Sequence, residues 1–321
     1  MASPVTLLNG GQPREPICIR IGDITVAVSS ADPKMRIELQ EETRRFEVPQ
    51  TIPDTTVRAS WDDLSERRSG RMLFDSGGAW QLYGEDGSYA FHFSSPLLGA
   101  APYKVARFDT RFRWGEVCFH GPYFSPEQAV HPLEYPLDEL LILNLLSQGK
   151  GVELHACGLA DANGDGYLFA GQSGDGKTTM ARLWESEPGV TILSDDRIIL
   201  RRRHGEFWMH GTPWHGEAEL ASAARAPLKA IFFLRRGDRN ALTAKVHAEA
   251  AALLFSRSFP LFYSSAGLEF TLEFYDRLTR AVPCYELRVV PNRQVIEFIR
   301  KELGDTDSHR FPRVRAHVDP C

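Results

Sequence analysis

Cysteines are few in this sequence and follow no pattern. The five cysteines are Cys18, Cys118, Cys157, Cys284 and Cys321, and no two of them form a CxxC pair. An odd and scattered set argues against a disulfide framework and against a structural zinc site. It is typical of a reducing compartment, so we predict a cytoplasmic protein.

Long hydrophobic runs are absent as well. The longest candidate, Leu137–Leu146, is interrupted by Asp138, Glu139 and Asn144 and falls short of the roughly 18 apolar residues that a membrane span requires. Residues 1–16 show no positively charged start followed by an apolar stretch, so no signal peptide is expected. We therefore expect no membrane partner.

The chain also lacks an excess of positive charge. It has 37 lysines and arginines against 42 aspartates and glutamates, which gives a net charge of −5. Proteins that bind the nucleic-acid backbone usually carry a basic excess, so we expect no nucleic-acid partner. With 321 residues, 43% of them hydrophobic, the chain can form one large or two modest globular domains.

The first half of the chain is predicted to be rich in β-strands. Short alternating runs are separated in places by turn clusters such as Asp75–Gly78 and Gly84–Gly87, a spacing that indicates an antiparallel meander. The predicted strands are 17–21, 24–28, 57–60, 71–74, 80–83, 89–93 and 117–119. We assign residues 1–131 to a β-rich N-terminal domain and suggest that it recognises an acceptor or a partner.

The second half alternates strands and helices, which indicates an α/β core covered on both faces. A helix over 137–147 joins the two halves and is stopped by Gly149 and Gly151. Further helices are predicted at 177–187, 248–256, 269–280 and 292–303, and strands at 152–158, 166–170, 190–194, 197–202, 207–210, 230–234 and 285–290. We assign 132–303 to this second domain and 304–321, which shows no apolar period, to a mobile tail.

A glycine-rich loop is the strongest functional signal. Gly171-Gln-Ser-Gly-Asp-Gly-Lys-Thr178 fits the Walker A pattern G-x-x-x-x-G-K-[ST], between a predicted strand and a predicted helix. Glycines let backbone N–H groups point at phosphate oxygens, and the helix that follows offers its free N–H groups and positive dipole. Lys177 would reach the β- and γ-phosphates, and Thr178 would hold Mg²⁺. The residues predicted to bind ATP are Gly171, Ser173, Gly174, Asp175, Gly176, Lys177, Thr178 and Thr179.

Two carboxylates follow one helix and one strand after the loop. The run Val190–Ser194 ends at Asp195 and Asp196, where an acid can bind Mg²⁺ or take a proton from an acceptor hydroxyl. Neighbouring residues on an extended strand point in opposite directions, so one carboxylate could face the reaction while the other is structural. A surface turn is the alternative for Ser-Asp-Asp, and the position after the loop favours the functional interpretation.

Two further side chains have two interpretations each. His155, on the strand before the loop, is either a polar neighbour of the acid or the phosphate, or a structural histidine in a strand. Arg257 follows a helical run. It is either an ordinary surface arginine, which we favour, or a residue that reaches the transferred phosphate.

The order of these motifs resembles the catalytic domain of HPr kinase/phosphorylase, whose P-loop core is shared with ATP-dependent phosphoenolpyruvate carboxykinase. The resemblance rests on Glu153-Leu-His155, the loop 171–178 and Leu193-Ser-Asp-Asp196, in that order. A later block, Phe207–Glu217 followed by Ala226–Arg235, is also similar. These segments lie within residues 150–303, roughly half of the chain.

The resemblance implies a P-loop kinase fold and ATP-dependent phosphorylation of a hydroxyl, with Mg²⁺ as the metal. An aspartate of the pair would act as the base, assisted by His155, while Lys177 binds phosphate. Thr178, Asp196 and Glu217 would hold Mg²⁺. Relatives in this family assemble as oligomers, so the resemblance also allows a homo-oligomer.

The sequence departs from the family pattern at two places within the motifs, and the first 130 residues do not resemble the regulatory domain of HPr kinases. Lys177 is followed by Thr178-Thr179 where the family has Ser-Glu, and His210–His215 replaces a glycine-rich signature. The acceptor therefore stays open between a protein serine, a peptide and a small alcohol. Two other functions also stay open. One is an ATP-binding sensor that transfers nothing, and the other is a carboxykinase-like lyase, which would need a second lysine and a histidine at a metal.

Overall fold

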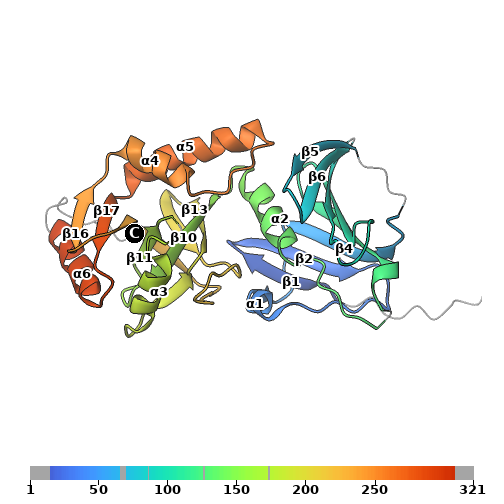
Figure 1. The fold of residues 1–321 in the computed structure, drawn as a ribbon, viewed down its shortest axis with the longest axis horizontal. Coiled ribbons are helices and arrows are strands. Elements are labelled where there is room, and N and C mark those ends of the chain that lie inside the picture. The colour runs from blue at the N-terminus through green and yellow to red at the C-terminus, as the bar shows by residue number, and fades with distance from the viewer. Residues whose placement is uncertain (1–14, 66–69, 86, 126, 173, 308–321) are drawn as a thin grey trace, which may run out of the picture.

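Two large β-sheets, one from each half of the chain, form the framework of the protein (Figure 1). The computed structural model describes residues 15–307 apart from 66–69, 86, 126 and 173. Most of the helices pack on the second sheet (Figure 1). The prediction of a mixed α/β protein is therefore confirmed.

Nine strands of the first half form one sheet in the order β3-β1-β2-β4-β9-β8-β7-β6-β5. Their bounds are β1 Ile17–Ile21, β2 Ile24–Ser30, β3 Glu47–Val48, β4 Thr55–Asp62, β5 Arg71–Asp75, β6 Trp80–Glu85, β7 Ser88–Phe93, β8 Lys104–Asp109 and β9 Trp114–His120. The strands from β5 to β9 are antiparallel neighbours, as the meander predicts. A simple meander is nevertheless wrong, because β4 pairs in parallel with both β2 and β9.

Strand β8 is missing from the sequence prediction because charged residues interrupt its apolar alternation. Lys104 at its start is completely buried, a position that is rare for lysine unless it is paired. Its Nζ lies 3.0 Å from Glu134 Oε1 and 4.6 Å from the centre of the Phe93 ring. These partners are distant in the sequence, so periodicity alone could not reveal the strand.

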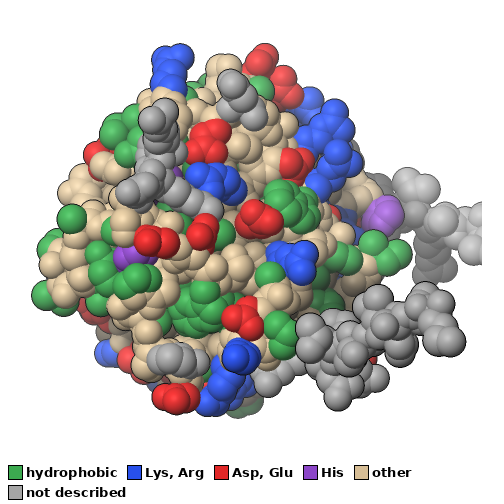
Figure 2. All heavy atoms as spheres, turned by 90° about the vertical axis from the view of Figure 1, so that its right-hand side faces the viewer, with side chains coloured by type: hydrophobic (Ala, Val, Ile, Leu, Met, Phe, Trp, Pro, Cys, Tyr) green, Lys and Arg blue, Asp and Glu red, His purple; other side chains and the backbone are tan. Residues whose placement is uncertain are grey.

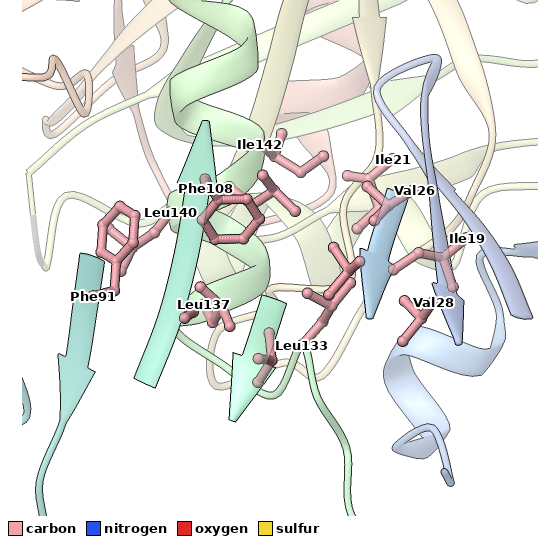
Figure 3. Packing of buried hydrophobic residues seen from close by; sticks show 14 of the residues in the cluster. Ile19, Ile21, Val26, Val28, Phe91, Phe108, Leu133, Leu137, Leu140 and Ile142 are labelled. Carbon is pink, nitrogen blue, oxygen red and sulfur yellow. The ribbon is translucent and has the colours of Figure 1, made fainter. Parts of the chain in front are cut away.

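Helix α2, Leu137–Leu146, is buried along its whole length between the two sheets. Its apolar residues belong to the hydrophobic core of the first sheet, together with Ile19, Phe91 and Phe108 (Figure 3). Two short helices, α1 Glu41–Arg44 and the 3₁₀ helix η1 Gly121–Tyr123, complete this half. Although the predicted boundary at residue 132 places α2 in the second domain, its side chains pack into the first core.

Eight strands of the second half form a mixed sheet in the order β11-β10-β13-β14-β15-β17-β16, with β12 beside β10 and a further pairing of β11 with β15. Their bounds are β10 Val152–Ala160, β11 Gly166–Ala170, β12 Thr191–Ser194, β13 Arg197–Arg203, β14 Glu206–His210, β15 Arg225–Arg236, β16 Ala241–Ala244 and β17 Cys284–Val289. The helices are α3 Lys177–Glu185, α4 His247–Phe255, α5 Ser265–Ala281 and α6 Gln294–Asp307.

Helices cover both faces of this sheet, as the sequence predicts. Helices α3 and α6 contribute Met180, Trp184 and Ile299 to one core cluster, while α4 and α5 contribute Leu254 and Leu278 to another. The helix α5 is longer than predicted because Ser264 caps it, accepting a hydrogen bond from Gly267 N at 3.1 Å. The helix α6 runs to residue 307, past the predicted end at 303, and 308–321 lie outside the described residues.

Asp23, in the turn between β1 and β2, joins the first sheet to the second. Its carboxylate accepts hydrogen bonds from Arg203 and from Arg225 Nη1, the latter at 2.9 Å and 3.1 Å. We expect Asp23→Asn to lower the free energy of unfolding by about 1 kcal/mol in urea denaturation, because both arginines are half exposed. Asparagine tolerates the φ of +56° at this position, so the change tests the charge.

The matched control for this prediction is Arg277→Ala, which breaks an exposed pair with Glu273 inside one helix. Such pairs contribute about 0.3–0.5 kcal/mol, so this variant should stay close to the parent protein. Equal losses in both variants would contradict a role of Asp23 between the sheets.

On the face shown in Figure 2, acidic and basic side chains are interspersed with apolar ones. Within residues 15–307, no helix is both long and apolar enough to span a membrane. The four cysteines of this part, Cys18, Cys118, Cys157 and Cys284, are buried, and no disulfide joins them.

Candidate active site

Strand pairing brings the groups singled out in the sequence to one edge of the second sheet. Ala170, the last residue of β11, pairs with Ala156 of β10, and the glycine-rich loop follows directly. The Ala156 N–H donates to the Asp196 carbonyl at 3.0 Å, and His155 pairs with Arg197 across β10 and β13. The loop, His155 and Asp196 therefore lie at the same edge.

The loop turns tightly between β11 and α3. Gly174 and Gly176 have φ values of +86° and +105°, a region that glycine adopts without strain. A Cβ atom at either position would meet no atom within 4 Å, so the space beside the loop is open. Asp175 closes the turn, since its Oδ2 accepts a hydrogen bond from Gln172 N at 2.6 Å. The predicted ligand Ser173 lies outside the described residues.

The N-terminus of α3 faces this open space. Gly176 is its N-cap and no described side chain caps the helix there, so the N–H groups of the first turn can bind an anion. Thr178 is half-buried in that turn, and Thr179 is exposed beside it.

Lys177 is folded back onto the loop. Its Nζ donates to the carbonyls of Gly171 at 2.9 Å and Gln172 at 3.2 Å, and only 8% of the residue is exposed. Among the described residues it forms no ion pair. Burial lowers the pKa of its ammonium group, against the opposing effect of the Asp196 and Asp175 charges. A buried cation held by neutral carbonyls is suited to an anionic ligand.

Asp196 is held by His155 and Arg197 and keeps one side open. Its Oδ1 lies 3.1 Å from His155 Nδ1, its Oδ2 accepts a hydrogen bond from Arg197, and 23% of its side chain is exposed. Burial raises the pKa of its carboxyl, but the hydrogen bond with His155 and the charges of Arg197 and Lys177 outweigh this effect. The pKa therefore falls below its ordinary value of 3.8, and the group is a carboxylate at neutral pH.

Asp195 points the other way and is only 2% exposed. Its two oxygens accept hydrogen bonds from the backbone N–H groups of Gly216 and Ala218, each at 2.9 Å. This carboxylate therefore holds the loop after β14 in place. The expectation that adjacent acids face opposite directions is met, and the two carboxylates have different surroundings.

Glu217 lies on that same loop, is exposed and forms no ion pair among the described residues. Nor does that part of the chain hold a cluster of three His, Cys, Asp or Glu side chains suited to a metal ion. Mg²⁺ usually takes one or two protein ligands and completes its shell with water and phosphate. Thr178 and Asp196 both carry oxygen ligands of the kind that Mg²⁺ prefers.

Arg197 holds Asp196 in place, and the sequence analysis does not predict this role. Its Nε lies 3.0 Å from Glu139 Oε1 on α2 and 3.7 Å from Glu153 Oε1 on β10, and its guanidinium carbon lies 4.3 Å from the centre of the Phe259 ring. Burial raises the pKa of Glu153 well above its ordinary value of 4.5, and the nearby Glu139 adds to this. The only local signal was a basic residue directly after the acid pair.

A cavity of about 390 Å³ opens beside Asp196. Both halves of the chain line it, with Glu42 and Thr43 from α1 on one side and Trp214 on the other. Trp214 is fixed by a hydrogen bond from its Nε1 to Asp138 Oδ2 of 2.8 Å. The described residues that line the cavity include none from the glycine-rich loop or from α3.

The favoured interpretation of Arg257 as a surface arginine is wrong, because only 8% of the residue is exposed. Its backbone carbonyl accepts the His155 N–H at 2.7 Å, which places it at the same sheet edge. Its Nη1 donates to the Leu253 carbonyl at 2.9 Å and to Ser256 Oγ at 3.1 Å.

Comparisons with known proteins give one family match. A family model described as "ScmC: SynChlorMet cassette protein ScmC" matches residues 139–301, just over half of the chain. The curated proteins contain no match. Among solved structures, the "Structure of the Hpr(Ser) kinase/phosphatase from Coxiella burnetii" is 12% identical, with a TM-score of 0.31. The alignment covers 51% of this chain and 99% of that chain.

Proposed function

The chain belongs to the family described as SynChlorMet cassette protein ScmC, and we propose that it is an ATP-dependent kinase that phosphorylates a hydroxyl group. One observation carries the proposal. A glycine-rich loop with a buried lysine lies at the same sheet edge as an ionised aspartate that faces a cavity. The first group suits a phosphate donor and the second suits an acceptor hydroxyl.

The donor would bind on the loop. Backbone N–H groups of the loop and of the first turn of α3 would donate hydrogen bonds to the phosphates. Lys177 Nζ, which donates to the carbonyls of Gly171 and Gln172, would donate to phosphate oxygens instead. Thr178 and Asp196 are the residues that would hold Mg²⁺, which neutralises charge on the β- and γ-phosphates when bound. We propose that these parts form a P-loop kinase core of the HPr-kinase type.

Asp196 would be the base of this reaction, and His155 and Arg197 position it. The bond between the γ-phosphorus and its bridging oxygen breaks, and that electron pair leaves with ADP. A new bond forms from the acceptor oxygen to phosphorus, and the hydroxyl proton passes to Asp196. Asp195 is the weaker candidate, because its oxygens face two backbone N–H groups and not the cavity.

The cavity beside Asp196 would take the acceptor. Since α1 of the first half lines one side of it, the N-terminal half would help to recognise the acceptor. The division of roles predicted from the sequence, with recognition in 1–131 and catalysis in 132–303, is part of this proposal.

The depressed pKa of Asp196 predicts a pH profile. Because the carboxylate is ionised well below neutral pH, kcat/KM should not fall from pH 7 to about pH 5 through protonation of this base. His155→Leu removes the hydrogen bond that lowers the pKa of Asp196, so an acid limb should move toward neutral pH. If kcat/KM of the parent protein falls below about pH 6, and this fall occurs at the same pH in His155→Leu, the assignment of Asp196 as the base is contradicted.

Nucleotide binding tests the proposal itself. Isothermal titration with ATP, ADP and AMP in the presence of Mg²⁺ should show binding of ATP and ADP, and much weaker binding of AMP. The loop and Lys177 contact the β- and γ-phosphates in this proposal, and AMP lacks both. If none of the three nucleotides binds, the loop is not a nucleotide site and the proposed function is wrong.

A further inference from the structure

A second cavity, of about 350 Å³, shares the lining residues Tyr135 and Arg197 with the cavity beside Asp196. Strands β5 and β6 of the first half, helix α2, and the segment 258–263 of the second half all contribute to its wall. Sites for small molecules usually have volumes of about 300–1,000 Å³. This cavity is therefore large enough for a ligand group, and it adjoins the place proposed for the acceptor.

The wall of this second cavity is largely apolar and aromatic. Phe74 and Trp80 stack with their ring centres 5.1 Å apart. The Tyr263 hydroxyl donates to Asn144 Oδ1 at 2.9 Å, which fixes that ring against α2. The apolar side chains of the lining include Phe74, Trp80, Leu140, Leu143, Phe259 and Phe262. A wall of this kind, held by contacts within the protein, suits a flat apolar group.

Two aromatic residues of the lining are open to solvent. Phe262 is 70% exposed and Tyr135 is 56% exposed. A single exposed apolar side chain is ordinary on a protein surface, but these two line the same cavity. An apolar group bound there would cover aromatic surface that now faces water, which favours binding.

The charged groups at this cavity neutralise each other. Glu139 and Arg197 are the only charged residues among the described residues that line it, and Arg197 Nε donates to Glu139 Oε1 at 3.0 Å. Arg197 also donates to Asp196, and its guanidinium carbon lies 4.3 Å from the centre of the Phe259 ring. A charged ligand would lose its hydration without gaining a free countercharge from this lining, so the cavity favours an uncharged group.

We propose that this cavity binds an uncharged aromatic group of the acceptor, while the cavity beside Asp196 holds the hydroxyl that is phosphorylated. This inference rests on the proposed kinase function and adds the class of acceptor to it. Arg197 connects the two places, because it bonds Asp196 and stacks on Phe259. The acceptor is then an alcohol or a hydroxyl-containing peptide with an aromatic ring near its hydroxyl, and not a polyol or an anionic alcohol.

The test compares matched acceptors with and without an aromatic ring on the protein loaded with MgADP. The peptide pair is N-acetyl-phenylalanyl-serine amide and N-acetyl-alanyl-serine amide, and the small-molecule pair is 2-phenylethanol and ethanol. In NMR titrations, we expect the aromatic member of at least one pair to bind about 10- to 100-fold more tightly, the effect of burying one phenyl ring. The pair that shows the difference tells whether the ring belongs to a peptide or to a small molecule.

Phe262→Asp should remove this preference, because it places a charge in the apolar wall. Phe262 is largely exposed, so the variant should fold, and thermal unfolding checks this. Phe262→Leu keeps the wall apolar and should retain most of the preference. The matched control is Ile52→Asp, at a residue that is 92% exposed and outside the lining, and it should behave like the parent.

Equal binding of the two members in both pairs, or a preference that survives in Phe262→Asp, would overturn the inference. Transfer from γ-labelled ATP into host lysate separates it from the proposed function. The preferred aromatic compound should slow this transfer in the parent protein, whereas its aliphatic counterpart should not. Transfer that the aromatic compound leaves unchanged would also overturn the inference. If no label is transferred without any compound, the kinase proposal fails, and the titrations alone decide whether the cavity binds an aromatic group.

Discussion

Replacing Lys177 by methionine is expected to weaken ATP binding strongly. Methionine keeps the length of the buried stem but removes the ammonium group that now donates to the Gly171 and Gln172 carbonyls. In the proposed complex this group binds phosphate oxygens, and a charge-assisted hydrogen bond of this kind contributes about 1.5–3 kcal/mol. We therefore expect the Kd for MgATP to rise by roughly 10- to 150-fold, as measured by isothermal titration.

Phosphoryl transfer should fall further than binding does in this variant, since the lysine also stabilises charge that develops during transfer. Lys229→Met is the matched control, because Lys229 is exposed and pairs only with Asp165 among the described residues. It should bind and transfer like the parent. A Lys177 variant with unchanged affinity and turnover would mean that the loop does not bind the phosphates.

The second large effect is expected at Asp196. Asp196→Asn keeps the shape of the side chain but cannot accept the hydroxyl proton, so phosphoryl transfer should fall by about 100- to 10,000-fold. The affinity for ADP measured without Mg²⁺ should change much less, because Lys177 and the loop amides are intact and the proposed metal contact of Asp196 does not contribute. The measurement is the transfer rate from labelled ATP at saturating nucleotide, with thermal unfolding as the check on folding.

Asp195→Asn is the comparison variant, and we expect it to lower the stability of the folded protein and not the rate of phosphoryl transfer. Its amide would place an N–H group opposite the backbone N–H of Gly216 or Ala218, where the carboxylate now accepts. We expect the free energy of unfolding to fall by about 1–3 kcal/mol, with transfer largely retained at temperatures where the variant is folded. If Asp195→Asn loses transfer and Asp196→Asn keeps it, the assignment of the base is reversed.

The sequence could predict the loop because its signal is local. The glycines at 174 and 176 adopt positive φ angles, and the lysine and threonine begin the following helix, all within one short segment. The acid pair was also found by its distance from the loop. Alternation along a strand predicted opposite directions for the two carboxylates but could not say which would face the cavity.

The remainder of the site depends on contacts between distant segments. Arg197 binds Glu139 on α2, and the cavity beside Asp196 forms only where α1 meets the second half. The sequence favours a surface position for Arg257, because the helical run before it gives no sign of the strand that carries Phe233. The parallel pairing of β4 with β2 and β9 escaped prediction for the same reason, since hydrophobic patterns specify faces and not neighbours.

Phosphoryl transfer is the step that separates a kinase from a protein that only senses ATP. The measurement is incubation of the parent protein and Asp196→Asn with γ-labelled ATP, Mg²⁺ and host lysate, which is then separated into protein, peptide and small-molecule fractions. We expect label in one fraction with the parent protein and almost none with the variant, although both bind nucleotide. Tight ATP binding with no label in any fraction, or equal label with both proteins, would contradict a kinase that uses Asp196 as its base.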